Sequence, residues 1–483
     1  IRAIRAPNRF VVFTLLAILF KFGHIFSSEY TWFLELMRPV IIWIALPDTQ
    51  TIKTKLRRTL LIWLPFLLIF LISTIWRGFF YTPLRKSFHV QSALFANPLQ
   101  TIAAWALNLV PDLLIILFTS WYNVFSADYF YLTRPLNLVL LALTALVSAG
   151  VFFALRTLKK EVEQKTAWHW QAVLLSLPAL LFGILPFYIA GYTLHQTNND
   201  RLAVAVIPGA ALLLTVLVEK MVSSQKTRYI LLALLVGLSA TWHIRYTNEF
   251  RKAWFYQRDF FQQLLWRAPG LRPGTLVYAI HPNPPYADDP VTEFALHDTR
   301  IALALNAFYD PAPALDNSQV FYWYQSKLPP MELLKPSTPF VVESYTARFN
   351  GSSGDSLIIF YDPSISNCLR VIQPLDTTYP AYPASIRGLH DIVHSQPILP
   401  DVRQNELVRQ QVLGDKPVQT WCYYYQRAEL AAQFGHMEDI PPLWEEAEAL
   451  GLYPSHGLEY IPFIRAYARS EERRVGKECR SRW

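Results

Sequence analysis

The chain has 483 residues, of which 52% are hydrophobic and only 17% are charged. Soluble globular domains carry roughly 25% charged residues, so this composition excludes a wholly soluble protein and indicates a membrane protein. The formal net charge of +8 is concentrated in short basic segments between apolar runs, which accounts for it without a nucleic-acid partner. Apolar runs fill residues 10–244, which predicts a transmembrane domain over 1–244 and an external part after it.

Membrane-spanning helices need about 17–25 mostly apolar residues. Several segments of the first half meet this requirement, and we predict about seven spans, at 10–26, 30–46, 59–76, 136–156, 168–190, 202–218 and 229–244. A further apolar segment, 101–121, has Pro111 and Asp112 at its centre. We therefore expect it to lie in the interface or to re-enter the membrane instead of crossing it.

Basic loops predict the orientation, because Lys and Arg are enriched in loops on the cytoplasmic side. The loops 53–58, 156–165 and 220–228 are basic, and all of them fall on one side if 101–121 does not cross. We therefore expect a multi-pass protein of the bacterial cytoplasmic (inner) membrane. The loop 192–201 and everything after 244 would then lie on the outer face.

Ionisable residues gather at the predicted outer boundary, where Asp200 and Arg201 stand directly before an apolar run. Charged groups at this depth often mark a site. The alternative is that loops are polar and that Arg reaches lipid headgroups without any further role. Within the second predicted span, Glu35 and Arg38 are three residues apart and share a helix face, so we predict a structural ion pair between them.

Two segments carry a resemblance to a known superfamily. "NNDRLAVAVIPGAALLL" places Arg201 before an apolar stretch with Pro208, and "SSEYTWFLELMRPVIIW" places Glu29 before one with Pro39. These features resemble the GT-C superfamily of multispanning glycosyltransferases, which use polyprenyl-phosphate sugars. Leu202 follows Arg201 where that superfamily has Tyr, so the resemblance is partial. With "WRAPGLRPGT" and "WCYYYQRAELA", the segments are also similar to an uncharacterised group of bacterial multispanning membrane proteins with a TPR-like C-terminal tail.

The resemblance implies transfer of a sugar from a lipid-linked phosphate at the outer membrane face. Arg201 would bind the donor phosphate, because a guanidinium can hold two phosphate oxygens. Other basic residues of that face compete for this role: Arg77, Arg85 and Lys86. A carboxylate would act as general base or support it, and the candidates are Asp200, Asp128 and Glu29. In the superfamily the catalytic acidic residue lies in the first external loop, which we expect to precede Ile1 in a longer protein.

The sequence after the last predicted span indicates an external α/β domain over 245–417. A helix-like segment ends at Pro269, and strand-like runs follow it: "TLVYAI", "QVFYWYQ", "TPFVVESYTA", "SLIIFYD" and "CLRVIQP". Asp289, Glu293 and His297 are spaced i, i+4 and i+8, so on a helix they share one side and are candidates for a divalent metal. Helix capping by Asp289 and a solvated face are the alternative. No other cofactor is indicated.

Residues 418–468 are helix-like again. Two segments separated by Gly435 and His436 resemble a TPR helical hairpin, which would bind a protein partner; a closing helical pair of the α/β domain is the alternative. Residues 470–483 have neither helical nor strand periodicity and resemble a non-native, vector-derived tail. Cys368 and Cys422 precede this tail, and they either form one disulfide or remain free thiols.

Three functions compete on these grounds. The first is a glycosyltransferase-like enzyme that uses a polyprenyl-phosphate sugar. The second is a non-catalytic cell-envelope scaffold that binds partners through its external modules. The third is a transporter, which would show internal repeats and broken helices at mid-membrane. The chain has no GxGxxG after a strand, no GxxxxGK[ST], no HExxH and no GxSxG, so nucleotide, zinc-protease and serine-hydrolase sites are not predicted.

Overall fold

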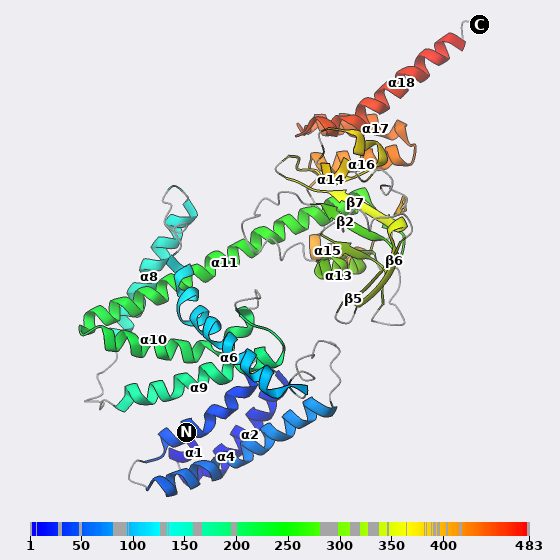
Figure 1. Ribbon diagram of the computed structural model, residues 1–483. Coiled ribbons are helices and arrows are strands. Elements are labelled where there is room, and N and C mark those ends of the chain that lie inside the picture. The colour runs from blue at the N-terminus through cyan, green and yellow to red at the C-terminus, as the bar shows by residue number, and fades with distance from the viewer. Residues whose placement is uncertain are drawn as a thin grey trace. The chain divides into compact units, whose positions relative to one another are not determined.

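The computed structural model describes residues 2–5, 7–27, 31–47, 51–80, 94, 96–125, 133, 135–157, 167–194, 200–280, 298–309, 319–326, 338–344, 347–363, 365–380, 382, 384–387, 389, 393, 397–401, 404–414 and 418–480. Contacts divide the chain into two compact units, which we call unit 1 (Ile1–Arg245) and unit 2 (Tyr246–Trp483) (Figure 1).

Unit 1 is helical throughout its described part. Its elements are α1 (Arg2–Arg5), η1 (Pro7–Arg9), α2 (Phe10–Ser27), η2 (Trp32–Met37), α3 (Arg38–Ala45), α4 (Ile52–Ile75), η3 (Trp76–Phe80), α6 (Pro98–Leu114), η4 (Ile115–Thr119), α7 (Ser120–Tyr122), η5 (Asn123–Phe125), α8 (Pro135–Thr157), α9 (Ala167–Ile189), η7 (Asp200–Ala205), α10 (Ile207–Met221) and the first part of α11 (Gln225–Arg267). The segments η3 and η4 are π-helical, and the other η segments are 3₁₀ helices.

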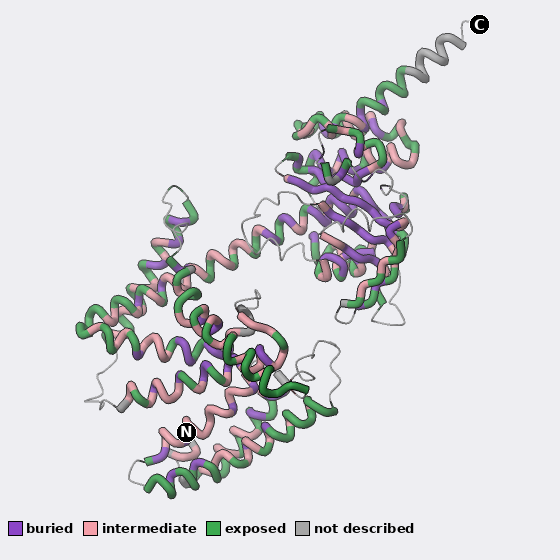
Figure 2. Tube along the Cα trace, in the orientation of Figure 1, coloured by how far each residue is buried: buried purple, intermediate pink, exposed green. Residues whose placement is uncertain are grey.

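The described part of the chain contains 5 helices that are long and apolar enough to cross a membrane. They are Ile52–Phe80, Pro98–Tyr122, Pro135–Thr157, Trp168–Ile189 and Gln225–Arg267, with Phe10–Ile25 as a shorter apolar helix. Many of their Leu, Ile and Phe side chains are exposed, and Figure 2 shows these helices largely in the colours of exposed and intermediate residues. Such surfaces suit contact with lipid, so the chain is a multispanning membrane protein.

Two predicted spans form broken helices. Segment 30–46 consists of the 3₁₀ helix η2 and the eight-residue α3, and segment 202–218 consists of the 3₁₀ helix η7 and the 15-residue α10. In both, proline stands at the start of the α-helix, Pro39 in α3 and Pro208 in α10. Proline lacks an N–H and clashes with the carbonyl four residues earlier, so an α-helix begins there and cannot run through it.

The segment expected to be interfacial or re-entrant forms a continuous helical run from Pro98 to Tyr122. Pro111 lies inside α6 without ending it, and the π-helical turn η4 follows. The expectation that Pro111 and Asp112 interrupt this helix is therefore wrong, because one missing N–H removes a single backbone hydrogen bond and the wider turn accommodates the distortion. Whether this helix crosses the membrane, and thus the number of spans, stays a prediction.

The helices α9 and α10 pack closely because glycine lines their contact (Figure 1). A Cβ on Gly209 would lie 2.8 Å from the Cβ of Ala179 and 2.9 Å from the carbonyl oxygen of Ser176. A Cβ on Gly183 would lie 2.8 Å from a methyl group of Val206. Small residues let membrane helices approach closely and gain van der Waals contact where water supplies no hydrophobic drive.

The last predicted span and the amphipathic helix after it are one helix, α11, which is 43 residues long. The aromatic residues of its C-terminal half divide into two groups. Phe260, Phe261 and Leu264 are buried in the core of unit 2, whereas Trp254 and Phe255 are partly exposed. The preference for a core position is therefore confirmed for the first group only.

Unit 2 contains the predicted α/β region. Its main sheet has the strand order β4-β2-β7-β8, with β2 (Leu276–Ile280) parallel to both β4 (Trp323–Gln325) and β7 (Ser356–Phe360), and β8 (Arg370–Val371) antiparallel to β7. The strands β2 and β7 are buried almost throughout, as central parallel strands are (Figure 2). Helix α13 (Asp298–Tyr309) packs against β4.

Smaller elements complete the α/β part. The second sheet has the order β3-β6-β5, formed by β3 (Gln319–Val320), β6 (Ala347–Ser352) and β5 (Pro339–Ser344). A third pairs β1 (Gly270–Leu271) with β9 (Ile398–Leu399). The remaining elements are η9 (Ser353–Asp355), η10 (Pro374–Thr378), α14 (Ala384–Arg387) and α15 (Glu406–Leu413).

The C-terminal helices are α16 (Trp421–Gln433), η11 (Met437–Asp439), α17 (Ile440–Ala449), η12 (Gly457–Tyr460) and α18 (Ile461–Arg480). The expected turn is present, with Gly435 at a φ of 82°. Helix α18 continues to Arg480, so the prediction of no regular structure after residue 470 is wrong at the level of the backbone. Its first turns pack against α16 and α17, which nucleate a helix that the charged sequence alone does not indicate.

A buried carboxylate joins this helical segment to the α/β part. The side chain of Glu459 has no exposed surface and accepts hydrogen bonds from the indole N–H of Trp421 at 2.8 Å, from the backbone N–H of Ser455 at 2.9 Å and from the hydroxyl of Ser366. A guanidinium nitrogen of Arg370 lies 3.9 Å away. Both segments therefore belong to one compact unit.

A disulfide between Cys368 and Cys422 strengthens the same junction, because it joins the segment before β8 to α16. Gln426 of α16 adds a hydrogen bond from its side-chain amide to the carbonyl oxygen of Leu369. Of the two alternatives left open for these cysteines, the structure contains the disulfide.

The glycine contact between α9 and α10 predicts that Gly209→Ala lowers the stability of unit 1 by about 1–3 kcal/mol, through overpacking. Gly150 of α8 is the matched control, because a Cβ there meets nothing within 4 Å. Thermal melting of the full-length protein in detergent measures both. A melting temperature of Gly209→Ala equal to that of Gly150→Ala would contradict the assigned close contact.

The Glu459 junction predicts that Glu459→Ala destabilises unit 2 by about 3–5 kcal/mol, since it leaves a buried guanidinium without its carboxylate and several donors without an acceptor. Glu445→Ala on the exposed side of α17 should change stability by less than about 0.5 kcal/mol. Denaturant titration followed by near-ultraviolet circular dichroism compares the two. Equal midpoints would show that Glu459 does not hold the segments together.

Candidate functional site

A buried group of charges lies where α2, η2 and α3 meet in unit 1. Lys21 Nζ is 3.0 Å from Glu35 Oε2, and the side chains of Lys21 and Glu35 are only 4% and 2% exposed. The guanidinium of Arg38 donates to both carboxylate oxygens, with Nη2 at 2.9 Å from Oε2 and Nε bonded to Oε1. We call these three residues the Glu35 cluster. The predicted pair of Glu35 and Arg38 is present, and Lys21 joins it from another helix.

Aromatic rings cover the cations of this region. The guanidinium carbon of Arg38 lies 3.9 Å from the ring centre of Phe66 on α4. At the end of the same helical run, the guanidinium carbon of Arg77 lies 4.7 Å from the ring centre of Trp32. Such contacts favour a cation by about 0.5–2 kcal/mol. They bring Arg77, a predicted competitor for the phosphate, next to the element that carries Glu35.

The composition of the region gives it a positive charge. Lys21, Arg38 and Arg77 face one buried carboxylate, Glu35, among the residues that the structure describes here. Arg38 is the accessible member of the cluster, since its side chain is 31% exposed. An excess of guanidinium groups at the edge of apolar helices is the arrangement that binds a phosphate, because each fork offers parallel N–H donors.

A second buried carboxylate, Asp112, lies on α6. It has no exposed surface and accepts hydrogen bonds from the hydroxyl of Tyr188 and from the backbone N–H of Leu194, both at 3.1 Å. The ring of Trp105 stacks on that of Tyr188 at 6.0 Å. The middle of α6 is thereby fixed to the end of α9 and to the first residues after it, which lead toward Asp200 and Arg201.

The pair of Asp200 and Arg201 begins the 3₁₀ helix η7, but its side chains lie outside what the structure describes. The other predicted positions outside the described residues are Glu29, Arg85, Lys86, Asp128, Asp289, Glu293 and His297. Within the described part of the chain, no group of three His, Cys, Asp or Glu side chains could hold a metal ion. The roles assigned to these residues stay predictions.

Lys21 is the residue that sequence reasoning missed. It interrupts the apolar run "FVVFTLLAILFKFGHIF", and a lone cation in such a run is itself a signal of a buried partner. Its partner Glu35 lies outside that helix, so no i, i+3 or i, i+4 spacing reveals the pair.

Unit 2 has a separate group of buried charges around Arg267, the last residue of α11. This guanidinium is 1% exposed, and none of its nitrogens has a hydrogen-bond partner among the described residues. Burial lowers the pKa of Arg267, while attraction to Glu429 and Asp376 opposes this effect. Burial also raises the pKa of both carboxyl groups. These charges couple the end of α11 to η10 and α16 at a distance, without direct hydrogen bonds.

Comparisons with protein-family models, curated proteins and solved structures yielded no match to this chain.

The Glu35 cluster predicts that Glu35→Gln destabilises unit 1 by about 3–5 kcal/mol, because Lys21 and Arg38 lose their shared counter-charge in a buried setting. Glu219→Gln is the control, since that carboxylate is 28% exposed and lies 3.1 Å from His169. Its loss should cost less than about 1 kcal/mol. Thermal melting in detergent compares the variants, and equal losses would contradict the counter-charge role of Glu35.

Proposed function

We propose that this membrane protein binds a lipid-linked phosphate at the end of unit 1 where Arg38 and Arg77 lie, and that it acts as a glycosyltransferase-like enzyme on a polyprenyl-phosphate sugar. The observation that carries the proposal is the excess of cations over carboxylates in this region, with Arg38 partly exposed and Arg77 over Trp32. The resemblance of the surrounding segments to the GT-C superfamily agrees with it.

The phosphate would be held by the guanidinium groups of Arg38 and Arg77, with Lys21 adding positive charge behind them. Glu35 would keep the two nearer cations in place without cancelling the net charge. The apolar surfaces of α2, α3 and α4 would carry the lipid chain. Arg201 remains the predicted further donor to the phosphate, and the base remains among Asp200, Asp128 and Glu29.

The disulfide between Cys368 and Cys422 supports an external position for unit 2, since disulfides persist outside the reducing cytoplasm. With unit 2 outside, α11 enters it from the membrane at its outer face, as the basic loops predict. The TPR-like reading of α16 and α17, with a protein partner, is part of this proposal. So are the bacterial inner membrane and the contact with membrane lipids.

The two broken helices favour a transporter as the second candidate. The segments η2-α3 and η7-α10 have the same order of a six-residue 3₁₀ helix followed by an α-helix that starts with proline. Both contact α9. Paired broken helices around one helix are a feature of transporters with internal repeats. A cell-envelope scaffold has no comparable observation in its favour.

We expect Arg77→Ala to weaken binding of polyprenyl phosphate to the purified full-length protein about ten-fold or more, since a charge-assisted hydrogen bond contributes about 1.5–3 kcal/mol. Arg58→Ala is the matched control, because Arg58 is an exposed arginine in the first turns of α4, at the other end of the same helical run. Binding in detergent is measured by microscale thermophoresis. Equal affinities of the two variants would sink the phosphate site.

The enzyme and the transporter differ in what happens to the lipid. Incubation with a radiolabelled polyprenyl-phosphate sugar in the presence of acceptor glycans or peptides should release polyprenyl phosphate if a sugar is transferred. A transporter would leave the lipid-linked sugar intact.

A further inference from the structure

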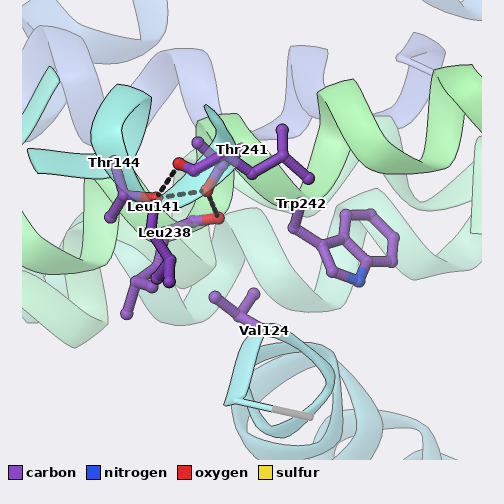
Figure 3. Close-up of a pocket in the computed structure, with 7 residues that line it drawn as sticks. Val124, Leu141, Thr144, Leu238, Thr241 and Trp242 are labelled. Atoms are coloured by element: carbon purple, nitrogen blue, oxygen red, sulfur yellow. Dashed lines mark hydrogen bonds between the residues drawn. The ribbon is translucent and has the colours of Figure 1, made fainter. Parts of the chain in front are cut away.

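A small apolar hollow lies between α8, α11 and η5, away from the Glu35 cluster. Figure 3 shows the side chain of Val124 and the indole of Trp242 approaching it from different sides. The full lining is Val124, Leu140, Leu141, Thr144, Leu238, Thr241 and Trp242. Its only hydroxyl groups, those of Thr144 and Thr241, are 2.9 Å apart and also hydrogen-bonded to backbone carbonyls, so they offer little to a polar ligand.

One end of the hollow is closed by tight packing of the two long helices. A Cβ on Gly237 of α11 would lie 2.1 Å from the hydroxyl oxygen of Ser148 and 2.8 Å from the carbonyl oxygen of Thr144, both on α8. The Thr144–Thr241 contact follows one turn later along α11. No chain can pass between the helices at this end.

The other end carries a polar pair. Asn137 is 1% exposed, and its side-chain oxygen accepts a hydrogen bond from Arg245 Nη1 at 3.3 Å. Arg245 lies four residues after Thr241, and Asn137 lies four residues before Leu141, so the pair is one helical turn from the lining on both helices. Arg245 also follows the apolar part of α11 directly, at the level where lipid headgroups are expected.

We propose that this hollow and Arg245 form a binding site for a phosphate-bearing lipid, with the hydrocarbon chain against Leu140, Leu238 and Trp242 and the phosphate at Arg245. A guanidinium presents N–H groups along more than one edge, so Arg245 can hold Asn137 and a phosphate oxygen together. The apolar lining selects a hydrocarbon chain, and the closed end at Gly237 sets how far along α11 the chain reaches.

The site shares no residue with Lys21, Glu35, Arg38 or Arg77, so it does not depend on the proposed function. The same chemistry is found in a glycerophospholipid and in a polyprenyl phosphate. Native mass spectrometry of the full-length protein, titrated separately with dioleoylphosphatidylglycerol and with undecaprenyl phosphate, distinguishes these two sources.

Two variants test the two parts of the site. Leu238→Trp fills the hollow, and Arg245→Gln removes the phosphate partner while keeping a polar side chain. Leu234→Trp is the matched control, since Leu234 lies one turn earlier on α11 and is exposed outside the lining. Arg77→Ala, which belongs to the other site, should leave this binding unchanged.

We expect the affinity for one of the two probes to fall about ten-fold in both Leu238→Trp and Arg245→Gln, and to stay unchanged in Leu234→Trp. The probe that responds identifies the lipid. Wild-type affinity of both variants for both probes overturns the proposal. A fall in Leu238→Trp alone overturns the role of Arg245. If Leu238→Trp melts below the control, Arg245→Gln at wild-type stability decides the outcome.

Discussion

The architecture of unit 1 depends on one buried carboxylate. Glu35 is the shared counter-charge of Lys21 on α2 and of Arg38 at the start of α3. A cation buried among apolar helices is unfavourable by several kcal/mol unless it is paired, so this carboxylate determines where α2 and the broken second segment can pack. Since one carboxylate serves two cations, the same arrangement leaves the region positive. Stability and the capacity to bind an anion therefore come from the same contact.

Local rules predicted part of this. The spacing of Glu35 and Arg38 indicated their pairing, and Pro39 and Pro208 stood where the structure begins new α-helices. The length of those helices was not predicted, because hydropathy counts apolar residues and does not register a change from 3₁₀ to α geometry. Pro111 shows the opposite error, since neighbouring helices stabilise a run that a single proline was expected to interrupt.

Long-range contacts account for most of what the sequence did not reveal. Lys21 reaches Glu35 from a different helix, and Asp112 receives the N–H of Leu194, 82 residues later. In unit 2, Glu459 stands next to the start of α18 and would be taken for an exposed acidic residue, yet it is completely buried between Trp421, Ser455 and Ser366. No periodicity within either segment indicates such contacts. By contrast, the strands of the α/β part, which are continuous apolar runs, were predicted at nearly the right positions.

The most direct test of the central claim is photo-cross-linking of radiolabelled polyprenyl phosphate to the full-length protein in nanodiscs. A benzophenone amino acid would replace Phe80, an exposed residue three positions after Arg77, or Leu56, an exposed residue at the other end of α4. The account predicts strong labelling at position 80 that excess unlabelled polyprenyl phosphate abolishes, and weak, non-competed labelling at position 56. Equal labelling at both positions would mean that the lipid only surrounds the protein, and it would contradict a phosphate site at Arg38 and Arg77.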